Sequence, residues 1–420
     1  MKLKLLRLAT PVCGLALLAL AAGLYILNYP LYLRALTTPG AYPLASPFLD
    51  WDNVASAIQC WRRGVDVYVN NPCDVLGRPF AYSPLWLRAT FIPAGVTWRY
   101  VVGLGLDILF ISSQYFVFRP ANWREAGTFA AAGVSTMAVF AAERANVDLI
   151  IYIMLVSSGT LSAKGLGRRL SAYGAILLAG FLKFYPFVGL VLALRERPRA
   201  LFAILAISAL AIVAFGYGYR HELAEMGRNI PQGRFGADDF GAANLLYLFP
   251  VILSSSGLWL AAFAVLTVLA GAVALSISLN AGFARAFASL DGRDRTLLTL
   301  GAAVIAGCYF SGQNISYRGI FLILVVGGLL AMRRGADDAA VRTRLGWLTV
   351  IIIALMWDGI YRSVLFSLNP ALWGPLWLIR EALWWYLAAA LLAVLITFAT
   401  QSESFVPARR WFERWRPRPG

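Results

Sequence analysis

The chain has 420 residues, of which 60% are hydrophobic and only 14% charged, and its formal net charge is +16. A soluble domain typically has about a quarter charged residues, so this composition argues against a soluble enzyme. A nucleic-acid-binding protein would not be this apolar. One His and four Cys exclude zinc sites built from several His or from two Cys-x-x-Cys pairs. The remaining class is an all-α polytopic membrane protein whose Lys and Arg gather on one side.

Apolar segments that match the roughly 20 residues needed to cross a bilayer recur along the whole chain. The first, 11–27, follows three basic residues and ends beside Tyr25, Tyr29 and Tyr32. That aromatic belt favours a membrane anchor over a cleaved signal peptide. The other predicted spans are 98–118, 125–142, 146–162, 200–216, 257–280, 296–312, 318–332, 347–365 and 376–399.

Residues 170–194 are apolar as well, but Lys183-Phe184-Tyr185-Pro186 interrupts them and Arg residues flank both ends. We expect two half-helices that enter and leave on the same face, since irregular backbone at membrane depth must line a protein cavity. The segment 84–95 is too short to cross the membrane, and we expect it to enter the membrane only part of the way.

The distribution of basic residues sets the orientation. With the N-terminus inside, the Arg-rich connections and the basic tail 400–420 face the cytoplasm, and the outer face receives the loops 30–97 and 217–256. Ten crossings then put both termini inside. No linker or repeat divides the chain, so 1–420 is predicted to be one membrane domain, with the nearly neutral outer face as the place for chemistry.

The loop 30–97 has the clearest pattern. Val54, Ala57, Ile58 and Trp61 share one face of a predicted amphipathic helix, which Gly64 ends. Asp50 and Asp52 lie at the start of that helix. They fit helix capping, and they also fit a general base at the lipid–water boundary.

The same loop resembles that of a known family. Asp50, Ala57, Gly64, Asp66-x-Tyr68 and Phe80-Ala81-Tyr82-Ser83-Pro84-Leu85 are spaced as in the first lumenal loop of glycosyltransferase family 87. The break at Lys183-Phe184-Tyr185-Pro186 is similar to that family's Lys-x-x-Pro step. Asn146 stands where the family often has Gly-Gln-x-Asn, although Glu143-Arg144 precedes it here. The resemblance covers most of 45–200.

The resemblance implies a GT-C type bundle of about ten transmembrane helices with one or two re-entrant segments. It also implies a mannosyltransferase that uses a polyprenyl-phosphate sugar, with an inverting mechanism. The catalytic acid falls on Asp50, with Asp52 as the alternative. No cofactor and no metal are expected, and the partners are the donor, a lipid or glycan acceptor and membrane lipids, without nucleic acid.

Two sets of outer-face residues complete the predicted site. Leaving-phosphate charge needs cations in a poorly hydrated place. The donor set is Lys183, Arg144, Arg318, Tyr317, Asn314 and Gln313, and the acceptor set is Glu143, Asn146, Asp148 and Tyr82.

Each of these residues has a structural alternative. Lys183 would snorkel to the interface, Arg144 would pair locally with acids, and Asp148 would stabilise a helix start. The polar stretch 311–318 would be an interface turn. Asp107, in an apolar span, is expected to face the bundle interior.

Cys60 and Cys73 lie thirteen residues apart in the outer loop, where an oxidising periplasm would permit a disulfide. The predicted location is a bacterial inner membrane with the site facing the exterior. Two rival functions are a lipid-linked sugar transporter or flippase, since transporters also use broken helices, and a polysaccharide polymerase or ligase.

Overall fold

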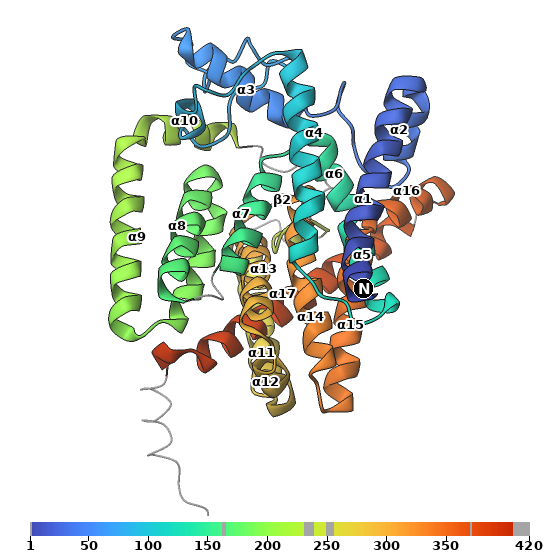
Figure 1. Ribbon diagram of the computed structural model, residues 1–420, viewed down its shortest axis with the longest axis vertical. Coiled ribbons are helices and arrows are strands. Elements are labelled where there is room, and N and C mark those ends of the chain that lie inside the picture. The colour runs from blue at the N-terminus through green and yellow to red at the C-terminus, as the bar shows by residue number, and fades with distance from the viewer. Residues whose placement is uncertain (1, 162–164, 231–238, 249–255, 370–371, 406–420) are drawn as a thin grey trace, which may run out of the picture.

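A computed structural model describes residues 2–161, 165–230, 239–248, 256–369 and 372–405. The described chain is almost wholly helical (Figure 1). Its α-helices are α1 (Lys2–Leu27), α2 (Tyr29–Thr37), α3 (Leu49–Arg62), α4 (Val96–Ser113), α5 (Trp123–Gly133), α6 (Thr136–Arg144), α7 (Asp148–Leu161), α8 (Leu166–Lys183), α9 (Pro198–Gly218), α10 (Arg220–Asn229), α11 (Ser256–Ser278), α12 (Ala281–Ala288), α13 (Gly292–Ser311), α14 (Leu322–Arg334), α15 (Ala339–Met356), α16 (Asp358–Leu368) and α17 (Trp373–Gln401).

Short 3-10 helices and one strand pair complete the secondary structure. The 3-10 helices are η1 (Trp86–Arg88), η2 (Gln114–Phe116), η3 (Tyr185–Arg195), η4 (Asn244–Leu248), η5 (Ser316–Phe321) and η7 (Glu403–Phe405). The strands β1 (Asp239–Phe240) and β2 (Asn314–Ile315) pair antiparallel, with Phe240 opposite Asn314.

Within the described residues, seven helices are long and apolar enough to cross a membrane, or up to eight if α5 and α6 form one bent span. The sequence predicts about ten, so the all-helical polytopic class agrees and the count differs. The predicted span 125–142 is the pair α5–α6, bent by 44°. The span 146–162 is the 14-residue α7, and 347–365 is divided between α15 and α16.

The segment 170–194 folds as a hairpin, as the interruption predicts. α8 ends at Lys183, and η3 begins at Tyr185 and runs back along it. The Phe181 and Phe187 rings are 5.3 Å apart across the bend. At the far ends, the Arg169 guanidinium pairs with the Glu196 carboxylate at 2.7 Å, so both ends of the hairpin lie together.

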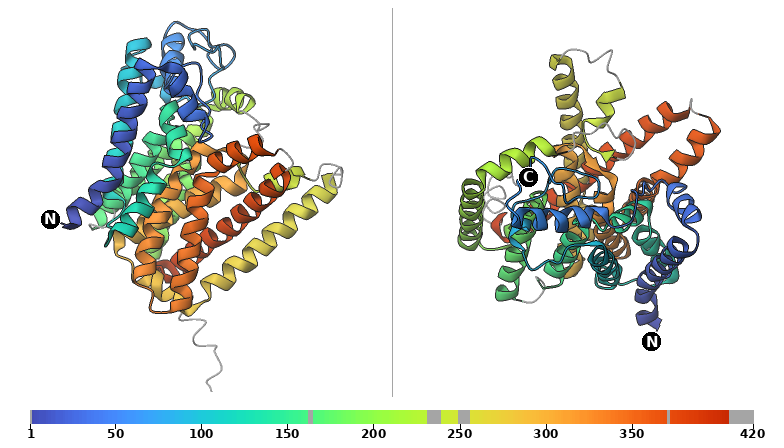
Figure 2. Two further views of the ribbon diagram at one scale, coloured as in Figure 1. Left: turned by 90° about the vertical axis from the view of Figure 1, so that its right-hand side faces the viewer. Right: turned by 90° about the horizontal axis from the view of Figure 1, so that it is seen from above.

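The helices pack as a bundle around a buried centre. α14 is buried along nearly its whole length, between α13, α5 and α15. α11 and α17 run side by side, and α1 packs against α4 and α5 (Figure 2). α9 is exposed over most of its apolar surface, as expected for a helix that contacts lipid.

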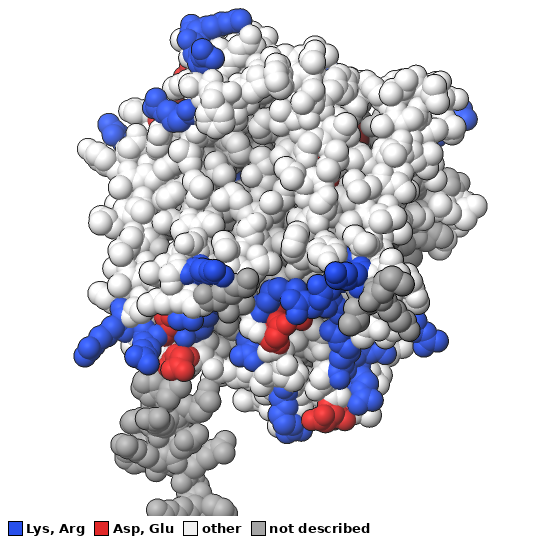
Figure 3. Space-filling model, viewed as in Figure 1, with Lys and Arg blue, Asp and Glu red and all other residues white. Residues whose placement is uncertain are grey.

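Charged side chains are strongly segregated. In Figure 3 the middle of the molecule is almost free of Lys, Arg, Asp and Glu, while Lys and Arg gather at the lower end, where Figure 1 shows α12 and the turn between α14 and α15. The opposite end contains α3 and α10. The predicted tail 400–420 is described only to Phe405, and part of the second outer loop, 231–238 and 249–255, also lies outside the described residues.

Candidate functional site

Three sharp backbone turns bring the predicted residues together. Among described residues, the non-glycine positions with positive φ are Phe48, Ala145 and Phe184. Side chains in this region of backbone space are uncommon, and such positions cluster at functional sites. Phe48 lies two residues before Asp50, Ala145 lies between Arg144 and Asn146, and Phe184 directly follows Lys183. The three turns therefore direct side chains of α3, of the α6–α7 junction and of the end of α8 toward one place.

Asp50 is the point at which these elements meet. Its side chain is buried, with a relative exposure of 8%. Asn146 donates from Nδ2 to Asp50 Oδ2 at 2.7 Å. The Arg78 guanidinium donates to Asp50 Oδ1 at 3.0 Å, and Arg144 Nη1 lies 3.7 Å from the same oxygen. Both carboxylate oxygens thus face cations or an amide, a setting that stabilises the negative charge.

Asn146 connects Asp50 to a second acid–base pair. Lys183 Nζ donates to Asn146 Oδ1 at 2.8 Å and also lies 2.7 Å from Asp148 Oδ1. Asp148 has no exposed surface, and the Lys183 side chain is 10% exposed. A buried ion pair persists only when its polar atoms are also hydrogen-bonded, and the Asn146 amide fulfils that role here. Lys183 is therefore held in the interior, and the snorkelling alternative is wrong.

Arg318 and Tyr185 complete the surroundings of Asp148. Tyr185 Oη donates to Asp148 Oδ1 at 2.5 Å, and Arg318 Nε lies 3.6 Å from Oδ2. The Arg318 guanidinium also stands over the Tyr185 ring, 4.9 Å from its centroid. Asp148 is the first residue of α7, where a negative charge is favoured. Asp148 therefore lies where it stabilises the start of α7, as expected, and it also pairs with two cations.

Asp50, Asn146, Asp148, Lys183 and Arg318 form one polar cluster. The other predicted residues lie in it or at its edge. The rings of Tyr82 and Tyr317 flank the Lys183 ammonium, with centroids at 5.4 and 5.5 Å. Glu143 lies beside Arg144, whose Nε is 3.4 Å from Glu143 Oε2. The local pairing expected for Arg144 is present, but Arg144 also approaches Asp50.

Two residues of the polar stretch 311–318, Asn314 and Gln313, have different partners. Asn314 accepts a hydrogen bond from Arg318 Nη1 and donates from Nδ2 to the Cys308 carbonyl at 2.6 Å. Gln313 instead donates to Asn244 Oδ1 at 3.0 Å. Gln313 therefore belongs to the contact between this turn and η4, whereas Asn314 orients Arg318.

Asp52 lies two residues along α3 from Asp50 and has different surroundings. It is buried, and its Oδ2 has no hydrogen-bond partner among the described residues. Burial raises the pKa of Asp52 above its ordinary value, partly offset by attraction to Arg99. Neither acid is the N-cap, which is Phe48 without a side-chain cap hydrogen bond. Both acids do lie in the first turn of α3, where the helix dipole favours a negative charge.

Sequence reasoning did not single out Arg78, Asp74 or Tyr185. Asp74 accepts hydrogen bonds from the Arg78 backbone at 2.9 Å and from its guanidinium at 3.1 Å, and the guanidinium also donates to the Leu49 carbonyl at 2.5 Å. These bonds from Arg78 hold the pKa of Asp74 below its usual range despite burial. Arg78 thus positions Asp50. No signal in the sequence marked Arg78, because the four-residue spacing from Asp74 predicts an ion pair only within a helix and these residues lie in a loop.

A disulfide joins Cys60 at the end of α3 to Cys73 in the following loop. Asn53 on α3 donates to Asp74 at 3.1 Å from the same side. Together these contacts fasten the loop that carries Arg78 to the helix that carries Asp50.

Within the described ranges, no three His, Cys, Asp or Glu side chains are grouped so that they could hold a metal ion. The cationic side chains of the cluster that could face an anionic ligand are Lys183, Arg318 and Arg144.

Comparison of the chain with protein-family models, with curated proteins and with solved structures finds no match.

Proposed function

We propose that the protein is a membrane glycosyltransferase that moves a hexose from a polyprenyl-phosphate donor to an acceptor hydroxyl on the outer face of a bacterial inner membrane. One observation supports this most strongly. A buried carboxylate, Asp50, is connected through a single amide, Asn146, to a buried ammonium, Lys183. A proton acceptor and a cation for a leaving phosphate are thereby held one residue apart, next to apolar helices.

The chemistry assigned to these residues is a displacement at the anomeric carbon. Asp50 accepts the proton of the acceptor hydroxyl while the acceptor oxygen bonds to the anomeric carbon. The bond from that carbon to the phosphate oxygen breaks on the opposite side, so the configuration inverts. The departing phosphate gains charge that Lys183, Arg318 and Arg144 stabilise, and such contacts are strong where water is excluded.

The arrangement around Asp50 holds the carboxylate in one position. Arg78 and Arg144 approach Oδ1, and Asn146 fixes Oδ2 by a hydrogen bond. The spacing resemblance to family 87 suggests mannose as the hexose, and the acceptor is a lipid or a glycan.

A transporter of lipid-linked sugars is the second candidate, favoured by one specific feature. The described chain has two interrupted helical segments, the α5–α6 bend and the α8–η3 hairpin, and both end beside the cluster. Interrupted helices at a central site are typical of secondary transporters.

One assay separates the two functions. Purified full-length protein in lipid nanodiscs is incubated with radiolabelled polyprenyl-phosphate mannose and a membrane lipid extract. A transferase releases polyprenyl phosphate and labels a new product, and Asp50→Ala abolishes both. If the donor stays intact with wild-type protein but crosses the bilayer of proteoliposomes, the transferase proposal is wrong and the transporter is supported.

A further inference from the structure

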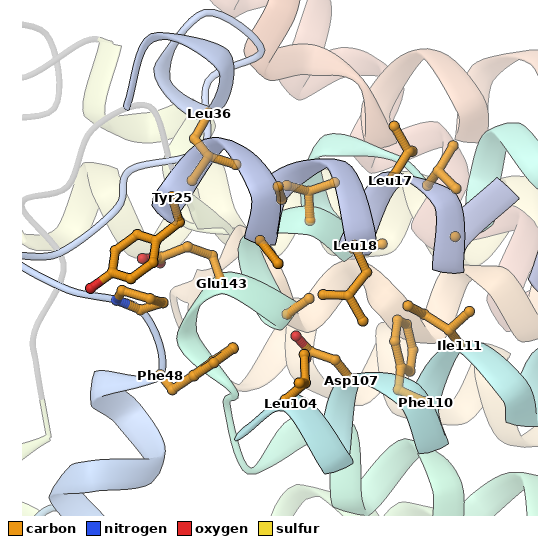
Figure 4. Close-up of a pocket in the computed structure, with 18 of the residues that line it drawn as sticks. Leu17, Leu18, Tyr25, Leu36, Phe48, Leu104, Asp107, Phe110, Ile111 and Glu143 are labelled. Atoms are coloured by element: carbon orange, nitrogen blue, oxygen red, sulfur yellow. The ribbon is translucent and has the colours of Figure 1, made fainter. Parts of the chain in front are cut away.

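A large cavity lies beside the polar cluster, between α1, α4 and α6. Its volume is about 470 Å³, within the range of small-molecule sites. Its walls are almost entirely apolar and include Leu18, Leu104, Phe110 and Val139. Figure 4 shows α1 along one side, with Leu17, Leu18 and Tyr25, and α4 facing it with Leu104, Phe110 and Ile111. The shape and lining suit a hydrocarbon chain.

Two acids interrupt the apolar lining. Asp107, on α4, is 1% exposed, and its Oδ1 has no hydrogen-bond partner among the described residues. Glu143, on α6, lines the same cavity (Figure 4). A buried polar atom without a partner is costly, so Asp107 calls for a hydrogen-bond donor from a bound molecule. A hydroxyl group fits this requirement.

The lining also disfavours an anionic ligand. Among the described residues no Lys or Arg lines the cavity. Arg144 pairs with Glu143 at its margin, whereas Lys183 and Arg318 pair with Asp148. A phosphate placed against Asp107 and Glu143 would find no cation among the lining side chains, in a poorly hydrated space where an unpaired charge is costly. The donor phosphate therefore belongs with Lys183 and Arg318, and the cavity requires a neutral, hydroxyl-bearing amphiphile.

The cavity also adjoins the catalytic candidate. Phe48 lines it and donates from its backbone N–H to the Glu143 carbonyl at 2.7 Å, two residues before Asp50. Arg144 lies 3.4 Å from the Glu143 carboxylate and 3.7 Å from Asp50. A head group that reaches Glu143 is then one side chain away from Asp50.

We propose that this cavity binds the hydrocarbon chain of a neutral, hydroxyl-bearing lipid, which is the acceptor of the transfer reaction. The acceptor role rests on the proposed glycosyltransferase function, while the lipid binding itself does not. Donor and acceptor chains then occupy separate places on either side of Asp50.

Photo-crosslinking tests the binding directly. Three probes carry a diazirine in the chain: a monoacylglycerol, the methyl ester of the same fatty acid, and farnesyl phosphate. Full-length protein in nanodiscs is irradiated with each, and labelled peptides of α1, α4 and α6 are measured by mass spectrometry. Wild-type protein is expected to be labelled in the cavity by the monoacylglycerol and much less by the other two probes.

Two variants and a matched control locate the site. Ala22→Trp fills the cavity and should remove monoacylglycerol labelling, whereas Ala206→Trp, on the exposed face of α9, should not. Asp107→Leu should abolish the preference for monoacylglycerol over the methyl ester, an effect that a merely destabilised protein would not show.

The proposal is overturned if Ala22→Trp leaves the labelling intact, if Asp107→Leu keeps the preference for hydroxyls, or if farnesyl phosphate labels the cavity best. Because no sugar transfer is measured, failure of the transferase assay with successful labelling would refute the acceptor role and leave the lipid site standing.

Discussion

At the scale of single residues, the site depends on side chains held by several partners at once. Asp50 is fixed by Arg78, Arg144 and Asn146, and Asp148 is fixed by Lys183, Arg318 and Tyr185. Ion pairs in such buried positions contribute less to stability than their number suggests, but removal of one partner is costly. Their joint effect is to hold the charges in fixed positions, as the proposed transfer reaction would require.

Arg78 is the most informative of these partners. Arg78→Ala leaves Asp50 and Asp74 without their main cation, so we expect the free energy of unfolding to fall by about 2 kcal/mol. The control is Arg228→Ala, which removes a surface pair with Glu225 and should change little. Urea or thermal unfolding in detergent provides the measurement. Equal effects of the two variants would show that Arg78 is not a support for Asp50.

Asp52 gives a prediction for pH dependence. Its pKa is raised in the folded protein by burial, so the folded state binds the proton more tightly than the unfolded state, in which the pKa is about 3.9. The penalty of the buried charge is therefore fully present above the raised pKa, shrinks as the pH falls below it, and is gone near the unfolded value of about 3.9.

Asp52→Asn removes that penalty. We expect it to raise the melting temperature at pH 8, and the gain over wild type should shrink steadily as the pH falls toward 4. Melting curves of both proteins across this range supply the test. A gain that is constant with pH, or that grows in acid, would contradict a raised pKa.

At the scale of elements, the loop after α3 acts as a support for the site. The disulfide Cys60–Cys73 closes a loop of thirteen residues, and cross-links of this length typically contribute about 3 kcal/mol. Removing both sulfurs in Cys60→Ser/Cys73→Ser should lower the unfolding midpoint and weaken the donor-dependent activity, because Arg78 follows in the same loop.

The matched control for the disulfide is Cys13→Ser, since Cys13 is a free and exposed thiol. The comparison is made by thermal unfolding without reductant. If the double variant has the same melting temperature as Cys13→Ser and wild type, the cross-link does not stabilise the loop.

A second element-scale support lies at α17. The Arg380 guanidinium is buried and pairs with Asp358 of α16 at 2.5 Å, and it donates to the Asp239 carbonyl of β1 at 2.8 Å. Arg380→Met would leave Asp358 and the adjacent Glu381 as buried, unpaired charges, so a loss of about 3–5 kcal/mol is expected. Denaturant titration should show a far smaller loss for Arg285→Met, in the last turn of α12 and in none of the ion pairs described. Comparable losses would mean that Arg380 holds no such network.

At the scale of the whole molecule, the segregation of charge predicts the orientation. Most Lys and Arg lie at the end opposite α3 (Figure 3), which the positive-inside rule assigns to the cytoplasm. In a Cys13→Ala background, a membrane-impermeant maleimide should label Asn70→Cys in intact cells and Ser289→Cys only after permeabilisation. The reverse pattern would place the site inside.

The sequence predicts the class of the molecule better than its details. Composition and hydropathy predict an all-helical polytopic chain, and the Lys183–Pro186 interruption predicts the hairpin, because both depend on local chemistry. The bend between α5 and α6 and the short α7 were missed, since a continuous apolar run does not reveal where helices break.

The same distinction applies to the site. Asp148 and Lys183 could be selected because an ionisable residue in an apolar helix is conspicuous, and Asp50 and Asn146 through the spacing that resembles family 87. Arg78 and Tyr185 could not, because Arg in a loop and Tyr in an apolar segment are ordinary there. Their roles depend on the turns at Phe48 and Phe184, and residues of this type rarely adopt positive φ.

The central claim is that Asp50 is the base of a sugar transfer. The direct measurement is the rate of product formation from radiolabelled polyprenyl-phosphate mannose by wild type, Asp50→Asn and Asp52→Asn, each checked for folding by its melting temperature. We expect Asp50→Asn to lower the rate by about 10²–10⁴-fold, the usual contribution of a general base, and Asp52→Asn to keep most of it. Undiminished transfer by a folded Asp50→Asn protein would contradict the account.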